Sequence, residues 1–385
     1  MAISTPDKQE SIIRERASTN IFPYDTYMEG EGIPIHRAVV GVDDVTTLER
    51  TKWARTGGRG AFIVLNGTFE SERGIYVADI PGGGALEPEK HLYEEEIFIL
   101  AGRGLTEVWQ GSGKKITFEW ETGSVFAIPP NATHRMLNGS REEVVFLAAT
   151  TAPRVMDAVF DLGVVFDSDY QFVDLYAHDN YFLIPEQKTT EGWYQQGIVH
   201  TNFIPDARRM MLDDLGRKVA GGQLTGYRMG HRFPAGHVSE WPAGRYHKAH
   251  YHGPGAILLG LDGEGYVLAW DSKLGPRPYQ SGHGDEVYKV NWTRNSIYSP
   301  PNAYFHQHFN TGHGPAKHIA VYGEHHPMGV HNMEEETGWK GFKSFREGGT
   351  LIEYEEEDPQ IRADFEAELR SKGIPMAMEP VTYRE

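Results

Sequence analysis

The sequence predicts an all-β protein with two tandem β-barrel or sandwich domains, an N-terminal arm and a C-terminal helix. Three observations support this fold class. Short apolar or alternating runs recur between glycine-rich and asparagine-rich turns, which is typical of antiparallel sandwiches and barrels. One ordered motif occurs twice along the chain. The best-marked helix signal lies in the C-terminal tail.

The strand-like runs form two separate regions. In the first region they are 61–67, 74–80, 96–101, 105–110, 115–120, 124–128 and 143–150. In the second region they are 223–229, 256–261, 265–270, 286–292, 296–299 and 317–325. We therefore divide the chain into an arm (1–60), a first β domain (61–150), an inter-domain segment (151–222), a second β domain (223–343) and a tail (344–385).

The tail carries a complete set of helix signals. Asp358 is a typical N-cap residue, Pro359 suits the first turn, and Gly373 can end the helix. Apolar side chains recur on one face at helical spacing: Ile361, Phe365 and Leu369. We expect this face to dock on the protein, and we expect the acidic run 353–358 before it to be a solvated loop.

The composition argues against several classes of function. The chain has 385 residues, a formal net charge of −17 and no cysteine. Negative charge disfavours nucleic acid and acidic membrane surfaces as partners, and the absence of cysteine excludes disulfides and thiolate metal sites. The polar N-terminus lacks a signal-peptide core, and no run of 18 apolar residues occurs. We therefore expect a cytoplasmic protein that does not bind a membrane.

The histidines are concentrated in the second half of the chain. Fourteen of the 18 lie after residue 199, and four form H-x-H pairs: His250 with His252, and His306 with His308. Residues i and i+2 share one face of a strand, so such a pair can bind one ion together. A third histidine from a neighbouring strand would leave positions open for water, oxygen or substrate. The alternative is a set of surface histidines with unrelated roles.

The chain contains an internal repeat whose first part has an offset of 161 residues. Residues 83–102 read G-x5-E-x-H-x3-E-x6-G, and residues 244–263 read G-x5-H-x-H-x3-A-x6-G. Further on, 123–138 matches 295–310, and both segments place a proline, a histidine and an asparagine at the same spacing. A repeat of this length indicates a duplicated domain rather than a solenoid unit.

These paired motifs resemble the two-part signature of the cupin superfamily, G-x5-H-x-H-x3-E-x6-G followed by G-x5-P-x4-H-x3-N. The resemblance covers about 61–150 and 223–343 and implies a bicupin, in which two small jelly-roll β-barrels follow each other. The superfamily includes dioxygenases, decarboxylases, isomerases, hydrolases and proteins that only store or bind, so the fold alone does not give the function.

The second domain resembles the metal cupin of gentisate 1,2-dioxygenase-like ring-cleaving dioxygenases. It has H-x-H with Ala256 at the usual glutamate position, and P-x4-H-x-H-x-N in the second part. The resemblance implies Fe(II) bound by His250, His252 and His306, with His308 as a catalytic hydrogen-bonding or proton-transfer group. The uncompensated charge of such a site favours a small anionic, chelating substrate. In that family the metal cupin is usually the first domain, whereas here it is the second.

The first domain carries a different set of possible ligands: Glu89, His91, Glu95 and His134. This set is more anionic and suits Mn(II) or another divalent ion. Its Glu-x-His pair resembles the manganese-binding cupin of ureidoglycine aminohydrolase. The alternative is a polar cluster without metal. Near the second site, we expect His247 to point away from His250, three residues later along the strand.

Three functions remain open at this point. The first is an Fe(II)-dependent dioxygenase that cleaves a carbon–carbon bond of a small anionic hydroxylated aromatic or diketone-like substrate. The second is a non-redox Mn-type hydrolase or lyase that acts on a small polar metabolite in the first domain. The third is a non-catalytic ligand-binding bicupin. In each case we expect a homo-oligomer, because bicupins commonly associate.

Overall fold

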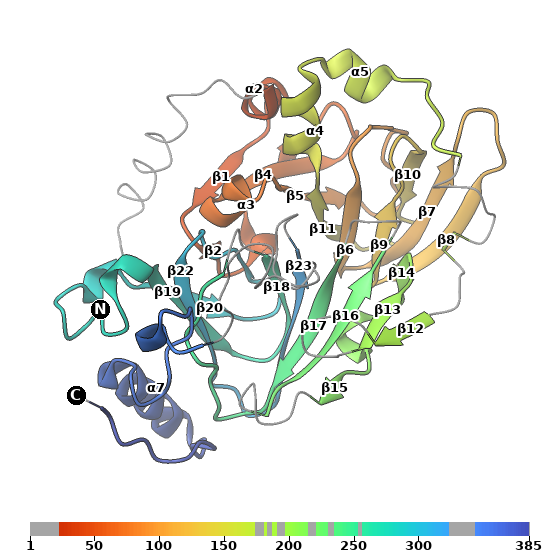
Figure 1. The fold of residues 1–385 in the computed structure, drawn as a ribbon. Helices are drawn as coiled ribbons and strands as arrows, with labels where there is room; N and C mark the ends of the chain where they lie inside the picture. The colour runs from red at the N-terminus through yellow and green to blue at the C-terminus, as the bar shows by residue number, and fades with distance from the viewer. Residues whose placement is uncertain are drawn as a thin grey trace.

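The predicted all-β fold class is confirmed, since the computed structural model consists of two jelly-roll barrels in tandem (Figure 1). The structure describes residues 23–173, 181–182, 187–190, 197–214, 221–229, 235–252, 256–322 and 343–384. The start of the predicted arm and parts of the inter-domain segment and second domain lie outside these residues. Each barrel combines one large sheet with one three-stranded sheet.

The first barrel has an eight-stranded sheet in the order β1-β4-β5-β11-β6-β9-β14, with β3 beside β4, and a small sheet in the order β10-β7-β8. The large-sheet strands are β1 Ile35–Ala38, β3 Thr51–Lys52, β4 Arg59–Leu65, β5 Gly74–Ile80, β6 Glu95–Ala101, β9 Val125–Ile128, β11 Val144–Thr150 and β14 Phe203–Ile204. The small-sheet strands are β7 Arg103–Trp109, β8 Ile116–Glu121 and β10 Thr133–Leu137.

The second barrel has a nine-stranded sheet in the order β12-β13-β16-β17-β23-β18-β21-β2, with β15 beside β16, and a small sheet in the order β20-β19-β22. The large-sheet strands are β2 Gly41–Val42, β12 Gln187–Thr190, β13 Gly197–His200, β15 Asp213–Asp214, β16 Gln223–Arg228, β17 Ala235–Trp241, β18 Ile257–Asp262, β21 Ile297–Tyr298 and β23 Ala316–Val321. The small-sheet strands are β19 Gly265–Asp271, β20 Tyr288–Trp292 and β22 Tyr304–Asn310.

The backbone repeats along with the sequence motif. Gly83 and Gly244 both have a φ of +70°, in the left-handed region that glycine adopts without strain. The motif glycine Gly123 has a φ of +96°, and Asn295, which stands at its place in the second domain, keeps a φ of +68°. Asparagine is one of the few other residues that tolerate this region. The same turns therefore position the candidate ligands in both barrels.

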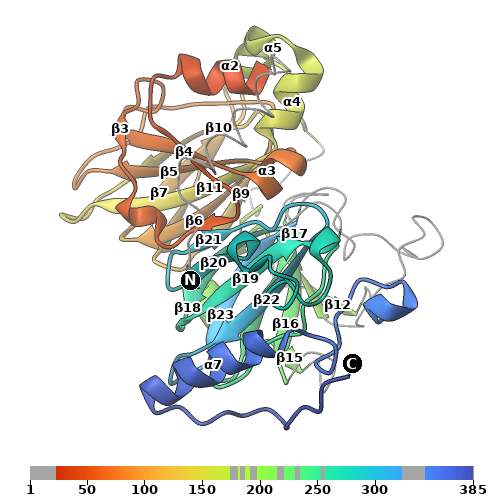
Figure 2. The same cartoon turned by 90° about the vertical axis from the view of Figure 1, so that its left-hand side faces the viewer.

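The two barrels share one hydrophobic core, formed between the outer faces of their large sheets (Figure 2). The first barrel contributes Ile63, Val77 and Leu147, and the second contributes Val238, Leu259 and Ile319, all at most 3% exposed. On β5 the alternate residues Tyr76 and Ala78 face the interior of the first barrel instead. Because such strands are buried on both faces, their sequences are continuous apolar runs.

The segment predicted as an arm forms strands with both barrels. Its β1 pairs in parallel with β4 of the first barrel, whereas β2 pairs antiparallel with β21 of the second. Farther along the chain, β14 returns to pair with β9 of the first barrel. Strand pairing by the N-terminal segment therefore joins the two barrels, in addition to the hydrophobic core that they share.

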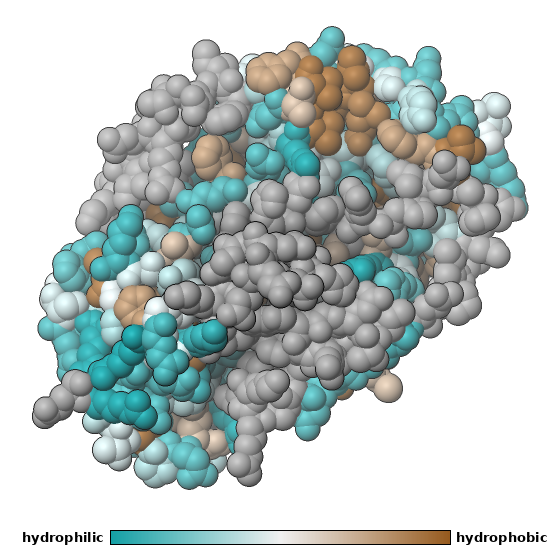
Figure 3. All heavy atoms as spheres, viewed as in Figure 1, coloured by the Kyte–Doolittle hydropathy of each residue, from teal (hydrophilic) through white to brown (hydrophobic). Residues whose placement is uncertain are grey.

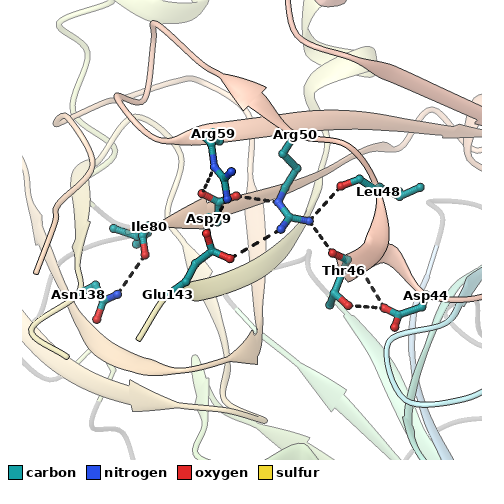
Figure 4. A network of polar contacts seen from close by, with 9 residues as sticks. All are labelled: Asp44, Thr46, Leu48, Arg50, Arg59, Asp79, Ile80, Asn138 and Glu143. Carbon is teal, nitrogen blue, oxygen red and sulfur yellow. Dashed lines mark hydrogen bonds and ion pairs between the residues drawn. The ribbon is translucent and has the colours of Figure 1, made fainter. Parts of the chain in front are cut away.

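An ion-pair network centred on the buried Asp79 attaches this N-terminal segment to β5 (Figure 4). The Asp79 carboxylate accepts hydrogen bonds from Arg50 Nε at 2.7 Å and Arg59 Nε at 3.0 Å. Arg59 also pairs with Glu143 at 2.6 Å, and Arg50 donates to the Thr46 carbonyl oxygen at 2.9 Å. Asp79 is 1% exposed, so its charge is stabilised by these two guanidinium groups rather than by water.

The helices of the described residues lie at the periphery, except for the short helix at 66–70, three of whose residues are buried (Figures 1 and 2). They are α2 Pro23–Gly30, α3 Asn66–Glu70, α4 Ala152–Val159, α5 Leu162–Asp167 and α7 Pro359–Lys372. Exposed apolar side chains gather where α4 meets α5, and the area is visible at the top of Figure 3: Val159, Phe160, Leu162 and Val164.

The predicted C-terminal helix is confirmed as α7. The Asp358 side chain caps Gln360 N at 3.0 Å, and Gly373 ends the helix in the left-handed region. Its predicted apolar stripe is buried against the second barrel: Ile361, Phe365 and Leu369. The expectation of a solvated acidic loop before α7 is wrong for the last three residues of 353–358. Glu356, Glu357 and Asp358 are buried, and their carboxylates accept hydrogen bonds from Ser344 of the tail and from Gln307 and Gln280 of the barrel.

Candidate metal centres

Two groups of side chains that could hold a metal ion occupy equivalent positions in the two barrels. In each group the ligand atoms all lie within 4.8 Å of one another, and the groups are His250, His252 and His306, and His91, Glu95 and His134. The backbone explains the equivalence, because His250 faces His306 in an antiparallel bridge just as Glu89 faces His134. The motif spacing and the turn between strands thus bring distant residues together.

In the second barrel, backbone contacts orient the histidine rings. His250 Nδ1 lies 3.2 Å from the Lys248 carbonyl oxygen, and His306 Nδ1 lies 3.1 Å from that of Tyr304. Since a carbonyl oxygen can only accept, each Nδ1 carries the proton and each Nε2 keeps its lone pair. The His250 and His306 ring centroids are 4.4 Å apart, and those of His252 and His306 are 4.9 Å apart.

At least two of the three imidazoles of the second centre are neutral, those of His250 and His306. Burial lowers the pKa of His250 and of His306 well below the ordinary value, and the neighbouring histidines lower it further. Among the described residues no carboxylate joins the three rings, and the equivalent of Glu95 is the buried Ala256. Three imidazole rings that converge on one point fit a divalent ion of borderline softness such as Fe(II).

The first centre combines two imidazoles with one carboxylate. Glu95 Oε2 lies 3.5 Å from His91 Nε2 and 3.3 Å from His134 Nε2, and Glu95 Oε1 accepts a hydrogen bond from the Tyr76 hydroxyl. His91 donates Nδ1–H to the Tyr93 carbonyl oxygen at 2.9 Å. His91 Nε2 and Glu95 Oε2 are buried and have no hydrogen-bond partner in the described structure. Unpartnered atoms aimed at one point fit a bound divalent cation.

Opposing effects act on the carboxylates of the first centre. Burial alone would raise the pKa of Glu95, but His134 and His91, which lie 3.3 and 3.5 Å from its Oε2, hold that pKa well below the usual range. Burial raises the pKa of Glu89. Glu89 does not join the compact group, although its Oε1 lies 3.9 Å from His134 Nε2. The structure therefore brings three of the four predicted residues together and leaves Glu89 beside them.

Aromatic side chains enclose the first centre. The Tyr93 ring stacks on His91 with centroids 3.7 Å apart, and Phe166 of α5 packs edge-on against Tyr93. The ring centroids of Tyr27 on α2 and Phe166 are 5.6 Å apart. The Arg55 guanidinium carbon lies over the Phe166 ring, 4.0 Å from its centroid. Two peripheral helices thus close this side of the first barrel.

His308, the predicted catalytic residue of the second barrel, lies on β22 beside the candidate ligands. Its ring centroid is 5.9 Å from that of His306, and Trp241 stacks on it with centroids 5.4 Å apart. Its Nδ1 lies 3.0 Å from the Tyr298 hydroxyl. The ring centroids of His247 and His250 are only 4.5 Å apart, so the expectation that His247 points away from His250 is wrong. It belongs to the loop 242–249 rather than to a regular strand, so the strand alternation does not apply.

Sequence reasoning missed a polar group on the opposite wall of the second barrel. Its members come from β17, β21, β23 and the residue after β23: His237, Ser239, Tyr298, His318 and Tyr322. They bond in pairs, with His237 Nδ1 at 2.7 Å from the Tyr322 hydroxyl and His318 Nε2 at 2.8 Å from Ser239 Oγ. The available signal was the two-residue spacing of His237 and Ser239, which places both on one strand face.

Comparisons with known proteins identify the class of the first barrel. Residues 76–150 match the family model of the cupin domain. Fold and site together therefore define a protein of two tandem jelly-roll barrels with a candidate metal centre in each, and the match to the cupin-domain model lies within the first barrel. No curated protein matches the chain.

Several solved structures are similar to the chain at low sequence identity. The coconut allergen cocosin is 11% identical with a TM-score of 0.47, and the match covers 74% of this chain and 85% of cocosin. Two variants of oxalate decarboxylase from Bacillus subtilis each give a TM-score of 0.44. The first variant is 12% identical, and the match covers 73% of this chain and 76% of the variant. The second is 11% identical, and the match covers 76% of this chain and 79% of the variant. No described helix is long and apolar enough to cross a membrane.

Proposed function

We propose that the protein is a metal-dependent dioxygenase whose working site is the second barrel. Fe(II) would be held by the Nε2 atoms of His250, His252 and His306. The substrate would be a small anionic molecule, a hydroxylated aromatic or diketone-like compound, and one of its carbon–carbon bonds would be cleaved. The observation that carries the proposal is the convergence of three histidines with no carboxylate among the described residues around them.

The ligand set explains the preference for an anionic chelator. Three neutral imidazoles do not compensate the charge of a divalent ion, so a substrate with negatively charged oxygens gains most from binding there. When bound, iron with three protein ligands supplies open positions for a bidentate substrate and for dioxygen. The protein's own contribution is orientation, since Nδ1 of His250 and of His306 is fixed on a backbone carbonyl oxygen.

Metal analysis and oxygen uptake test this proposal. The protein, purified anaerobically, is expected to bind one iron per chain in the second barrel and to consume oxygen with members of a panel of hydroxybenzoates and diketones. His252→Ala should lose that iron and the oxygen uptake together. Iron that stays bound in His252→Ala, or a wild-type protein that never loads iron, would contradict the proposal.

The first barrel supports a second candidate, a non-redox hydrolase or lyase that uses Mn(II) or another divalent ion. The specific observation is the pair of buried, unpartnered atoms His91 Nε2 and Glu95 Oε2. Glu89→Ala separates the candidates, because it should weaken metal binding in the first barrel and leave the iron of the second unchanged. If neither Glu89→Ala nor His252→Ala changes metal content, the remaining function is non-catalytic ligand binding.

A further inference from the structure

We propose that Ser239, His318 and Tyr298 are positioning residues that fix His308 as a hydrogen-bond donor through Nε2. Their role in catalysis rests on the proposed function of the second barrel, but the orientation itself follows from the hydrogen bonds. His308 would then offer an N–H group to an oxygen atom of the substrate, beyond the atoms that bind the metal.

The four side chains form one continuous chain of hydrogen bonds across the barrel. Ser239 Oγ of β17 lies 2.8 Å from His318 Nε2 of β23. His318 Nδ1 lies 3.2 Å from the Tyr298 hydroxyl of β21, and that hydroxyl lies 3.0 Å from His308 Nδ1 of β22. All four residues are at most 5% exposed, so water does not compete at these positions.

The tyrosine in the middle imposes a constraint on the two rings. The Tyr298 hydroxyl has one hydrogen and contacts two ring nitrogens, so it donates to one and accepts from the other. Burial raises the pKa of Tyr298 well above its ordinary value, which keeps that hydrogen on the oxygen. Therefore one of His308 and His318 carries a proton on Nδ1, and the other does not.

Ser239, at one end of this series of hydrogen bonds, sets the direction in which the bonds are donated. Within the described residues, the Ser239 hydroxyl contacts only His318 Nε2. If Ser239 accepted from His318, its own hydrogen would be buried without an acceptor, which is the more costly arrangement. Ser239 therefore donates to His318 Nε2, His318 Nδ1–H donates to Tyr298, and Tyr298 donates to His308 Nδ1. The ring hydrogen of His308 is consequently on Nε2.

The side chains around His308 make this part of the barrel interior rich in hydrogen-bond donors. Among the described residues His308 makes its side-chain hydrogen bond through Nδ1, and Trp241 stacking holds the ring. The indole N–H groups of Trp241 and Trp292 are buried without an acceptor among the described residues. Both indoles lie within 6 Å of the His308 ring, with centroid distances of 5.4 and 5.9 Å. Unmatched donors around His308 favour a ligand that brings acceptor oxygens.

Nitrogen NMR of the ring atoms tests the inference directly. The full-length chain is labelled with ¹⁵N in the imidazole rings, and spectra are recorded without metal and with diamagnetic Zn(II). The resonances of His308 are assigned by their loss in His308→Gln. In the wild type we expect the Nε2–H form of His308. Ser239→Ala removes the donor that sets the direction, so the Nδ1–H form of His308 should appear.

Tyr322→Phe is the matched control, because it removes a buried tyrosine hydroxyl of the same barrel that bonds His237 instead. The resonances of His308 should keep their wild-type positions in this variant. A wild-type His308 with its proton on Nδ1, or no response to Ser239→Ala, would overturn the inference. These spectra require neither iron nor turnover, so a failure of the dioxygenase proposal is detected separately by metal content and oxygen uptake.

Discussion

At the scale of single residues, the glutamate position of the motif distinguishes the two centres. Glu95 lies between His91 and His134 in the first barrel, whereas the equivalent Ala256 offers no ligand atom and packs among apolar side chains. The histidine orientation is otherwise shared, because Nδ1 contacts a backbone carbonyl oxygen in both barrels. The centres also differ where His250 stands in place of Glu89, so the two candidate ligand sets carry different charge.

Glu95→Gln should separate the metal affinities of the two barrels. Glutamine keeps the size of the side chain and an acceptor for the Tyr76 hydroxyl, but it removes the negative charge between the two histidines. We expect Mn(II) binding in the first barrel to weaken by roughly 10–100-fold, the usual scale for disturbing a metal site. Titration calorimetry with Mn(II) measures this change. Equal Mn(II) affinity in the variant and the wild type would contradict a site at Glu95.

The motif spacing was sufficient to predict which ligands converge, but not what faces them. His250, His252 and His306 come from two short motifs whose turns impose the contact. His318 and Ser239 meet only because β17 pairs with β23 in one particular register. That register depends on packing of the whole sheet and cannot be read from the residues of either strand.

At the scale of elements, three strands that carry candidate site residues were absent from the predicted strand runs: β10, β17 and β22. In β17, Val238 faces the core between the barrels, while His237 and Ser239 face the barrel interior. The interior of an ordinary barrel is apolar, so polar residues on that face hide the alternation that normally marks a strand. The strands whose local pattern disagreed with the fold were thus those that build the candidate site.

The buried Glu357 should make stability depend on pH. Its carboxylate accepts hydrogen bonds from the Tyr246 hydroxyl and from Gln307 Nε2, and burial raises its pKa from the ordinary value of 4.5 to about 7. As the pH rises from 4.5 to about 7, the unfolded state loses this proton first. The free energy of unfolding should therefore fall across that window by a few kcal/mol and then level off.

Glu357→Gln should remove this part of the pH dependence, because the neutral amide has no proton to lose. Urea unfolding from pH 4.5 to 8 measures the effect, and Glu355→Gln, two residues earlier and half-buried, is the matched control. A slope that persists unchanged in Glu357→Gln would assign the pH dependence to another group.

Helix α7 should contribute strongly to the second barrel through one aromatic side chain. Phe365 is fully buried, and its ring lies 5.1 Å from Tyr246 and 5.5 Å from Phe309. Phe365→Ala should lower the free energy of unfolding by about 3–5 kcal/mol, the usual cost of a large aromatic cavity. Arg370→Ala on the exposed side of the same helix should change it little. Equal urea midpoints for the two variants would show that α7 is not docked through this stripe.

At the scale of the whole molecule, the two barrels should unfold as one unit. They share the core between their large sheets, and the N-terminal segment pairs with strands of both. The repeat predicted two copies of one domain, but it carried no information on their packing. The core between them is formed by the outer faces of the large sheets, and the motif does not describe those faces.

Gly41→Ala tests this coupling from the N-terminal segment. Gly41 lies on β2 opposite Tyr298, and an added Cβ would lie 2.4 Å from the Ile297 carbonyl oxygen and 2.7 Å from Tyr298 Cβ. Backbone must shift to relieve these contacts, so the free energy of unfolding should fall by about 1–3 kcal/mol. Gly30→Ala is the control, since nothing lies within 4 Å of its added Cβ. Urea unfolding followed by tryptophan fluorescence and by circular dichroism should give one coincident transition at a lower midpoint for Gly41→Ala. Two separated transitions would show that the barrels unfold independently despite their shared core.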